Sequence, residues 1–135
     1  MKHKIIIVLI FLGYFLSFGH TIADYPQIVT QPSINELISI YAREYGASEK
    51  QLLVVSVCES KLNPNAIHYN DGGRGKHSVG LFQYQKTTFD AFADLKGEDL
   101  DYYSYNDQIK LTAYIFANYP ELKSRWTCAR IHHIV

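Results

Sequence analysis

The chain has 135 residues, of which 47% are apolar and 19% charged, and it carries 13 basic and 13 acidic residues. This length suits one domain and is too short for a TIM barrel, a Rossmann pair or two independent cores. The balanced charge argues against sequence-independent nucleic-acid binding, the apolar content against a disordered chain, and the two cysteines against a disulfide framework or a four-ligand zinc site.

Residues 1–23 have the composition of a secretory signal peptide. A basic start precedes an apolar run over residues 5–18, and small residues ending at Ala23 suit a cleavage site. The run is shorter than the roughly 20 residues that span a bilayer as a helix, although an uncleaved membrane anchor is the alternative. We therefore expect an exported protein (periplasm, cell envelope or extracellular) without a stable membrane span after cleavage, and a short lead-in over residues 24–33.

Two helices are predicted next, and each start is marked by a serine with Glu or Gln three residues later. After Ser33, apolar residues recur at three- and four-residue steps until Gly46 provides a stop. After Ser48, the segment 52–58 is apolar around its whole circumference. Such a helix is expected to be buried on all sides and to form the core of the domain.

The remaining chain predicts further helices after one glycine-rich segment. Residues 67–79 contain three glycines and predict a loop or an irregular hairpin. Helices are expected over residues 87–95, from Asn106 onward, and from Pro120 as a last short helix. Strand-type alternation is nowhere sustained. We therefore expect a small, mainly α domain over residues 34–130, packed around one buried central helix and monomeric.

Cys58 and Cys128 are interpreted in the light of the expected export. A lone pair of cysteines in an oxidising compartment is more often bridged than free. A bridge closing a loop of about 70 residues would contribute about 4 kcal/mol in the chain-entropy model. Two buried thiols are the alternative, because sequence alone does not show that the two residues meet.

Glu59 directly follows the apolar segment and lies on the same helix face as Val55 and Leu62. Such surroundings disfavour the charged carboxylate and raise the pKa of the acid. A carboxyl that stays protonated near neutral pH can act as a general acid toward a leaving oxygen. The alternative is that the helix simply ends there and Glu59 points into water.

Two short motifs accompany Glu59. A Glu-Ser pair at residues 59–60 is followed by Asn-Pro at 63–64, and Ser-Val-Gly-Leu-Phe-Gln occupies residues 78–83. In this order and spacing the motifs resemble those of the soluble lytic transglycosylase-type (SLT) domain, a relative of goose-type lysozyme. The resemblance extends over about residues 34–128 and implies a lysozyme-like fold, formally α+β.

The resemblance also implies a role for each matching residue. Tyr114 matches a tyrosine that sits near the glutamate in the family, although Asp107 and Leu111 stand where Asn and Gly are usual. The other implied site residues are Glu59 as the catalytic acid/base, Ser60 as an anchor of the turn or of the glutamate, Ser78 as a hydrogen-bond partner of the sugar, Gly80 for close backbone approach, and Gln83 in the cleft.

The substrate implied by the resemblance is the β-1,4 bond between N-acetylmuramic acid and N-acetylglucosamine in peptidoglycan glycan strands. Glycosidases normally use two carboxylates, whereas lytic transglycosylases use one acid/base together with the muramyl acetamido group and C6 hydroxyl. The product is a 1,6-anhydro end. No metal or cofactor is expected, because the histidines show no convincing ligand spacing.

Two other functions are open at this stage. In a hydrolytic lysozyme, Asp71 would be the second carboxylate beside Glu59, although its Asn-Asp-Gly-Gly context is more usual in a turn. A non-catalytic glycan-binding envelope module on the same fold would need neither carboxylate.

Overall fold

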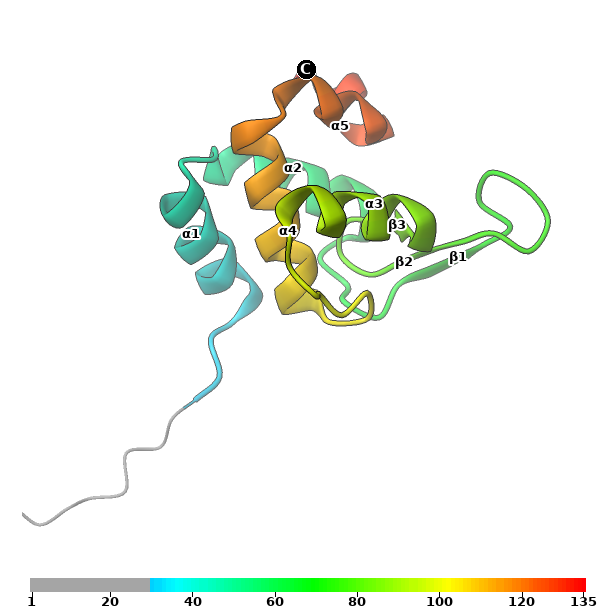
Figure 1. Cartoon of the computed structure of the whole chain (residues 1–135), viewed down its shortest axis with the longest axis horizontal. Helices are drawn as coiled ribbons and strands as arrows, with labels where there is room; N and C mark the ends of the chain where they lie inside the picture. Colours follow the sequence, from blue (N-terminus) through cyan, green and yellow to red (C-terminus); the bar gives the residue numbers. More distant parts are fainter. Residues whose placement is uncertain (1–29) are drawn as a thin grey trace, which may run out of the picture. The chain divides into compact units, whose positions relative to one another are not determined.

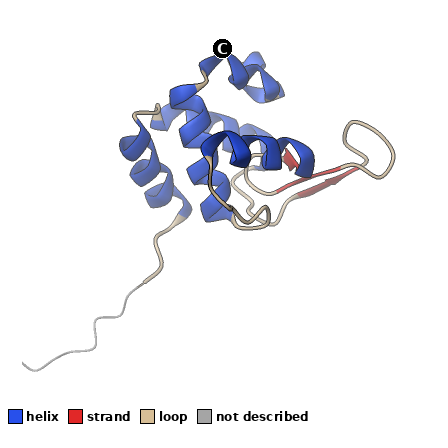
Figure 2. Cartoon of the chain, viewed as in Figure 1, coloured by secondary structure: helices blue, strands red, loops and turns tan. Residues whose placement is uncertain are grey.

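The computed structural model describes residues 30–135. The expected signal peptide and most of the expected lead-in lie outside these residues. Within them, none of the helices has both the length and the apolarity needed to cross a membrane. The elements, in chain order, are α1 (Ile34–Tyr45), α2 (Glu49–Ser60), β1 (Ile67–Tyr69), β2 (His77–Val79), β3 (Tyr84–Gln85), α3 (Lys86–Lys96), α4 (Tyr105–Asn118), the 3₁₀-helix η1 (Pro120–Arg125) and α5 (Thr127–Ile131) (Figures 1 and 2).

The structure is mainly helical, as predicted, and local sequence explains where the helices begin and end. Ser33 accepts a hydrogen bond from the Glu36 amide, and the Glu36 carboxylate accepts one from the Ser33 amide at 2.7 Å, which confirms the capping box. Ser48 caps α2 by accepting from the Gln51 amide. Gly46 ends α1 in the left-handed region, with φ of 78°.

The most extensively buried helix is α4, and the prediction that α2 is buried on all sides is wrong. In α2 the buried residues are Leu52, Val55 and Ser56, whereas Val57 is 48% exposed. The reason is that α2 packs against α1 and α5 only on part of its circumference, whereas α1, α3 and η1 all pack against α4. The buried residues of α4 are Gln108, Ile109, Leu111, Thr112, Ala113, Ile115 and Phe116.

The glycine-rich segment forms an antiparallel hairpin, one of the two predicted outcomes. In β1 and β2, Ile67 pairs with Val79 and Tyr69 with His77. A third strand, β3, continues the sheet, with Val79 opposite Tyr84. Figure 1 shows the β1–β2 hairpin extending away from the helices, with its loop at the far end. The hairpin and the turn between β2 and β3 carry the second sequence motif.

The last predicted helix is two elements, η1 and α5, which are separated at Trp126. The Trp126 side chain is 5% exposed, and its indole N–H donates to the Phe82 carbonyl at 2.9 Å. The backbone at Trp126 is extended, with φ of −90° and ψ of 126°, and this interrupts the helix where the ring enters the core. A disulfide between Cys58 and Cys128 then joins α5 to α2.

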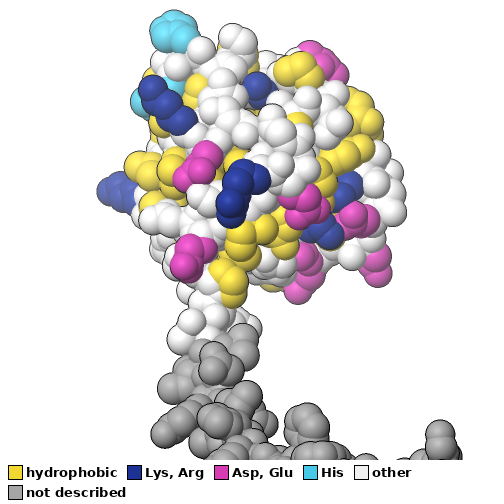
Figure 3. Space-filling view, turned by 90° about the vertical axis from the view of Figure 1, so that its left-hand side faces the viewer, with side chains coloured by type: hydrophobic (Ala, Val, Ile, Leu, Met, Phe, Trp, Pro, Cys, Tyr) yellow, Lys and Arg dark blue, Asp and Glu magenta, His cyan; other side chains and the backbone are white. Residues whose placement is uncertain are grey.

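Charged side chains of both signs share the surface. On the face shown in Figure 3, Lys and Arg side chains are interspersed with Asp and Glu and with apolar groups. This distribution agrees with the equal numbers of acidic and basic residues in the chain. On that face there is no extended area of one charge sign.

Candidate active site

Glu59 is the penultimate residue of α2 and is half-buried. Its Oε1 accepts a hydrogen bond from the peptide N–H of Cys128 at 3.1 Å. Burial raises the pKa of the Glu59 carboxyl above its ordinary value, the Cys128 N–H opposes the rise, and the nearby charge of Asp71 adds to it. The carboxyl therefore has the environment that a proton donor requires.

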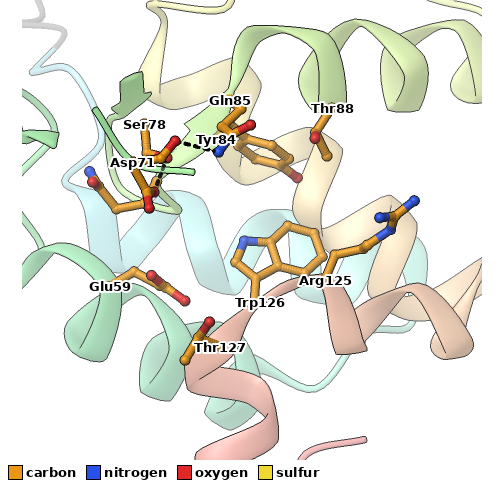
Figure 4. Close-up of a pocket in the computed structure, with 10 residues that line it drawn as sticks. Glu59, Asp71, Ser78, Tyr84, Gln85, Thr88, Arg125, Trp126 and Thr127 are labelled. Atoms are coloured by element: carbon orange, nitrogen blue, oxygen red, sulfur yellow. Dashed lines mark hydrogen bonds between the residues drawn. The ribbon is translucent and has the colours of Figure 1, made fainter. Parts of the chain in front are cut away.

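Glu59 borders two pockets. The first, which we call the Trp126 pocket, has a volume of about 300 Å³, and the second, the Asn65 pocket, has about 460 Å³. Both pockets are lined by Glu59 and Gln83. A carboxyl at the junction of two pockets can face a bond that joins two neighbouring sugar units. The other residues of the Trp126 pocket are Asp71, Ser78, Tyr84, Gln85, Thr88, Arg125, Trp126 and Thr127 (Figure 4).

Gln83 is held in place by the turn that connects β2 to β3. Its Nε2 donates to the carbonyl of Gly80 at 2.8 Å and to that of Ala66 at 3.3 Å. Its backbone is left-handed, with φ of 49°, a conformation uncommon for a residue with a side chain. The turn therefore fixes Gln83 beside Glu59, where both of them line the two pockets.

Ser78 and Asp71 lie together in the Trp126 pocket (Figure 4). The Ser78 hydroxyl, on β2, donates to the Asp71 carboxylate. Gln85 on β3 donates through Nε2 to the Asp71 carbonyl at 2.9 Å. These contacts hold the hairpin loop against the sheet, so that Asp71 is in the same pocket as Glu59.

Two of the implied site residues have evident structural contacts. The Ser60 hydroxyl donates to the Ser56 carbonyl at 3.0 Å, within its own helix, and Ser60 also lines the Asn65 pocket. Gly80 lines neither pocket. A Cβ atom at Gly80 would lie 2.4 Å from the amide atoms of Gln108, so the close approach that glycine allows is to α4.

Tyr114 is not brought together with the other implied site residues. It lines neither pocket of Glu59, and its ring packs edge-on against Tyr45 of α1, with centroids 5.6 Å apart. The Lys96 ammonium lies 4.7 Å from the Tyr114 ring centroid and 4.8 Å from that of Tyr45. Glu98 pairs with Lys96, whose side chain is only 6% exposed. These contacts make Tyr114 part of the packing between α1, α3 and α4.

The C-terminal part of the site was not predicted from the sequence. Arg125, Trp126 and Thr127 line the Trp126 pocket, and the next residue, Cys128, supplies the hydrogen bond to Glu59. The cysteines were the one signal in the sequence that could have located this part of the pocket. Since Cys58 directly precedes Glu59, a bridge to Cys128 necessarily brings the residues around position 128 to the glutamate.

Comparison with known proteins gives one family. The profile of the family described as Transglycosylase SLT domain matches residues 36–129, more than two thirds of the chain. No curated protein sequence and no solved structure shows a significant match. Over residues 30–135, no group of three or more His, Cys, Asp or Glu side chains is placed to hold a metal ion.

Proposed function

Because the chain belongs to the transglycosylase SLT domain family, we propose that it is an exported peptidoglycan lytic transglycosylase with Glu59 as its single catalytic acid/base. Family membership supports action on peptidoglycan glycan strands. The observation that carries the assignment of the residue is the half-buried Glu59 carboxyl at the junction of the Trp126 and Asn65 pockets.

The reaction uses the Glu59 carboxyl twice. Protonated Glu59 donates its proton to the glycosidic oxygen as the bond to C1 of N-acetylmuramic acid breaks, and the muramyl acetamido group assists at C1. The Glu59 carboxylate then takes the proton of the muramyl C6 hydroxyl, and the C6 oxygen bonds to C1. The 1,6-anhydro end forms without water, and the carboxyl regains its proton for the next cycle.

The products of digestion test this reaction. Purified sacculi incubated with the protein should release muropeptides with 1,6-anhydromuramyl ends, each lighter by one water than the hydrolytic product. Mass spectrometry of the soluble fraction distinguishes the two. Products with reducing muramyl ends would contradict transglycosylation and favour hydrolysis.

A hydrolytic lysozyme is the second function that the site supports. Asp71 lines the same pocket as Glu59, and its charge contributes to the raised pKa of the Glu59 carboxyl. Most glycoside hydrolases use two carboxyl groups at the scissile bond. The hydrogen bond from Ser78 holds the Asp71 carboxylate in the pocket, which either function could use.

Asp71→Asn separates the two functions. With Glu59 as the single acid/base, the variant should retain turnover, and the alkaline limb of its pH–activity profile should move to lower pH. The reason for the shift is that removing the Asp71 charge removes one cause of the raised pKa of Glu59. A loss of about 100-fold or more in kcat would instead show that Asp71 is a catalytic carboxylate. Asparagine can still accept the hydrogen bond from Ser78, so the loop geometry is kept.

A further inference from the structure

The Cys58–Cys128 disulfide lies next to Glu59. Cys58 and Glu59 are neighbours in α2, and Cys128 is bonded to the first and donates its peptide N–H to the second. The Cα atoms of the two cysteines are 5.9 Å apart, and the N–H donor is 3.1 Å from Glu59 Oε1. The bridge therefore lies directly beside the only backbone group in the described residues that hydrogen-bonds the Glu59 carboxyl.

Helix α5, which carries this N–H, depends on its surroundings for its conformation. It has five residues and begins without a side-chain cap, so it is too short to be stable by itself. It packs against α2 and η1, with Ala129 fully buried. The disulfide is the covalent link between α5 and α2, and the preceding residues Trp126 and Thr127 line the Trp126 pocket.

We propose that the Cys58–Cys128 disulfide positions Glu59 for catalysis, by holding the Cys128 peptide N–H on the carboxyl and α5 against the pocket. Cys58 and Cys128 are then positioning residues, and full activity requires the closed bridge. This inference rests on the proposed function of Glu59.

The groups around Glu59 show that its pKa depends on α5. Burial by the surrounding structure is the largest cause of its raised pKa, and the Cys128 N–H and the Arg130 guanidinium, both on α5, oppose the rise. Asp71 and His68, on the hairpin, act in opposite directions on the pKa of Glu59. Loosening α5 would remove the effects of Cys128 and Arg130, which lower the pKa of Glu59, and part of the burial, which raises it, so this pKa is expected to change.

The test is the double variant Cys58→Ser/Cys128→Ser, compared with wild type well below both melting temperatures. We expect kcat/KM on sacculi to fall by roughly tenfold or more, because the carboxyl loses the hydrogen bond that orients it in the pocket. The alkaline limb of the pH–activity profile should also shift, because it follows the pKa of Glu59. A purely structural bridge would lower the melting temperature and leave both kcat/KM and the alkaline limb unchanged, and that result would overturn the proposal.

Chemical reduction provides the matched control. A dithiol reductant transfers two electrons and two protons to the bridge, giving two thiols, and is itself oxidised to a cyclic disulfide. Wild type should lose activity on reduction and recover it on reoxidation, whereas the double variant should not respond. If the double serine variant does not fold, Cys58→Ala/Cys128→Val is used in its place. The valine keeps apolar packing at position 128, where the cysteine side chain is buried.

A titration that needs no turnover separates this inference from the proposed function. Carbon NMR of the labelled Glu59 carboxyl should give a different pKa in the double variant than in wild type. If wild type does not cleave sacculi, the proposed function fails, while this titration still decides whether the bridge controls Glu59. Identical titration curves in the two proteins would overturn the inference alone.

Discussion

Glu59→Gln is expected to reduce turnover of peptidoglycan by about 10²- to 10⁴-fold, the usual contribution of a general acid–base group. Glutamine has nearly the same shape and can still accept the hydrogen bond from the Cys128 N–H, which is 3.1 Å from Oε1 in the wild type. It has no acidic proton to transfer to the glycosidic oxygen and no carboxylate with which to accept one. Release of muropeptides from sacculi, measured against time, gives the ratio.

The same substitution should increase stability at neutral pH. Because the folded state raises the pKa of Glu59, the folded protein binds its proton more tightly than the unfolded chain does. The wild type therefore loses stability as pH rises through the folded pKa, and glutamine avoids that loss. Below the ordinary carboxyl pKa, where both states of the wild type hold the proton, the difference between the variants should disappear. Thermal melting at several pH values checks this.

Glu49→Gln is the matched control. Glu49 is an exposed acid at the opposite end of α2 and lines neither pocket of Glu59. Its substitution should leave turnover unchanged. If Glu59→Gln behaved in the same way and cleared sacculi at the wild-type rate, Glu59 would not be the acid. If the protein binds glycan equally well with Glu or Gln at position 59, and neither form releases muropeptides, it is the non-catalytic module.

Gly80→Ala should prevent folding or lower the melting temperature by about 10 to 20 °C, for a cost of about 3 kcal/mol or more. The backbone at Gly80 has φ of 80°, which disfavours alanine, and its Cβ would lie 2.4 Å from Gln108 Nε2 and Oε1. The Gln108 side chain has little freedom to move, because it is buried and Nε2 donates to the carbonyls of Val79 and Tyr102. Thermal unfolding followed by circular dichroism measures the loss.

Gly46→Ala isolates the conformational part of this cost. Gly46 has a similar φ of 78°, but no heavy atom lies within 4 Å of its added Cβ. The Gly46→Ala variant should be destabilised only by the cost of a left-handed alanine, about 1 to 2 kcal/mol. Equal losses at the two glycines would mean that Gln108 yields easily and that the overlap does not determine the requirement for glycine at position 80.

Features set by neighbouring residues were predictable from the sequence, and those set by distant contacts were not. Ser33 and Glu36 are three residues apart, so the capping box could be recognised without knowing the fold. The apolar circumference of residues 52–58 could not reveal which side of α2 stays exposed, because the choice depends on where α1 and α5 pack. For the same reason the sequence did not single out α4 as the most extensively buried helix.

The candidate site divides in the same way. The motif residues Glu59, Ser78 and Gln83 line one pocket. Tyr114 matches a family position by spacing, but the packing of α4 against α1 directs its ring to Tyr45. The pocket residues 125–127 lie far from both motifs in sequence, and the bridge was the only feature of the sequence that connected them to the motifs.

The 70-residue separation between the bridged cysteines has a consequence for biosynthesis. A nascent chain released before residue 126 would contain both sequence motifs and the glutamate itself. It would lack the Trp126 indole, and it would lack Cys128, which supplies both the N–H donor to the Glu59 carboxyl and the second thiol of the bridge. Such a fragment would match the family by its motifs and still have an incomplete candidate site, so we expect a truncated product of translation to lack the activity proposed for the full chain.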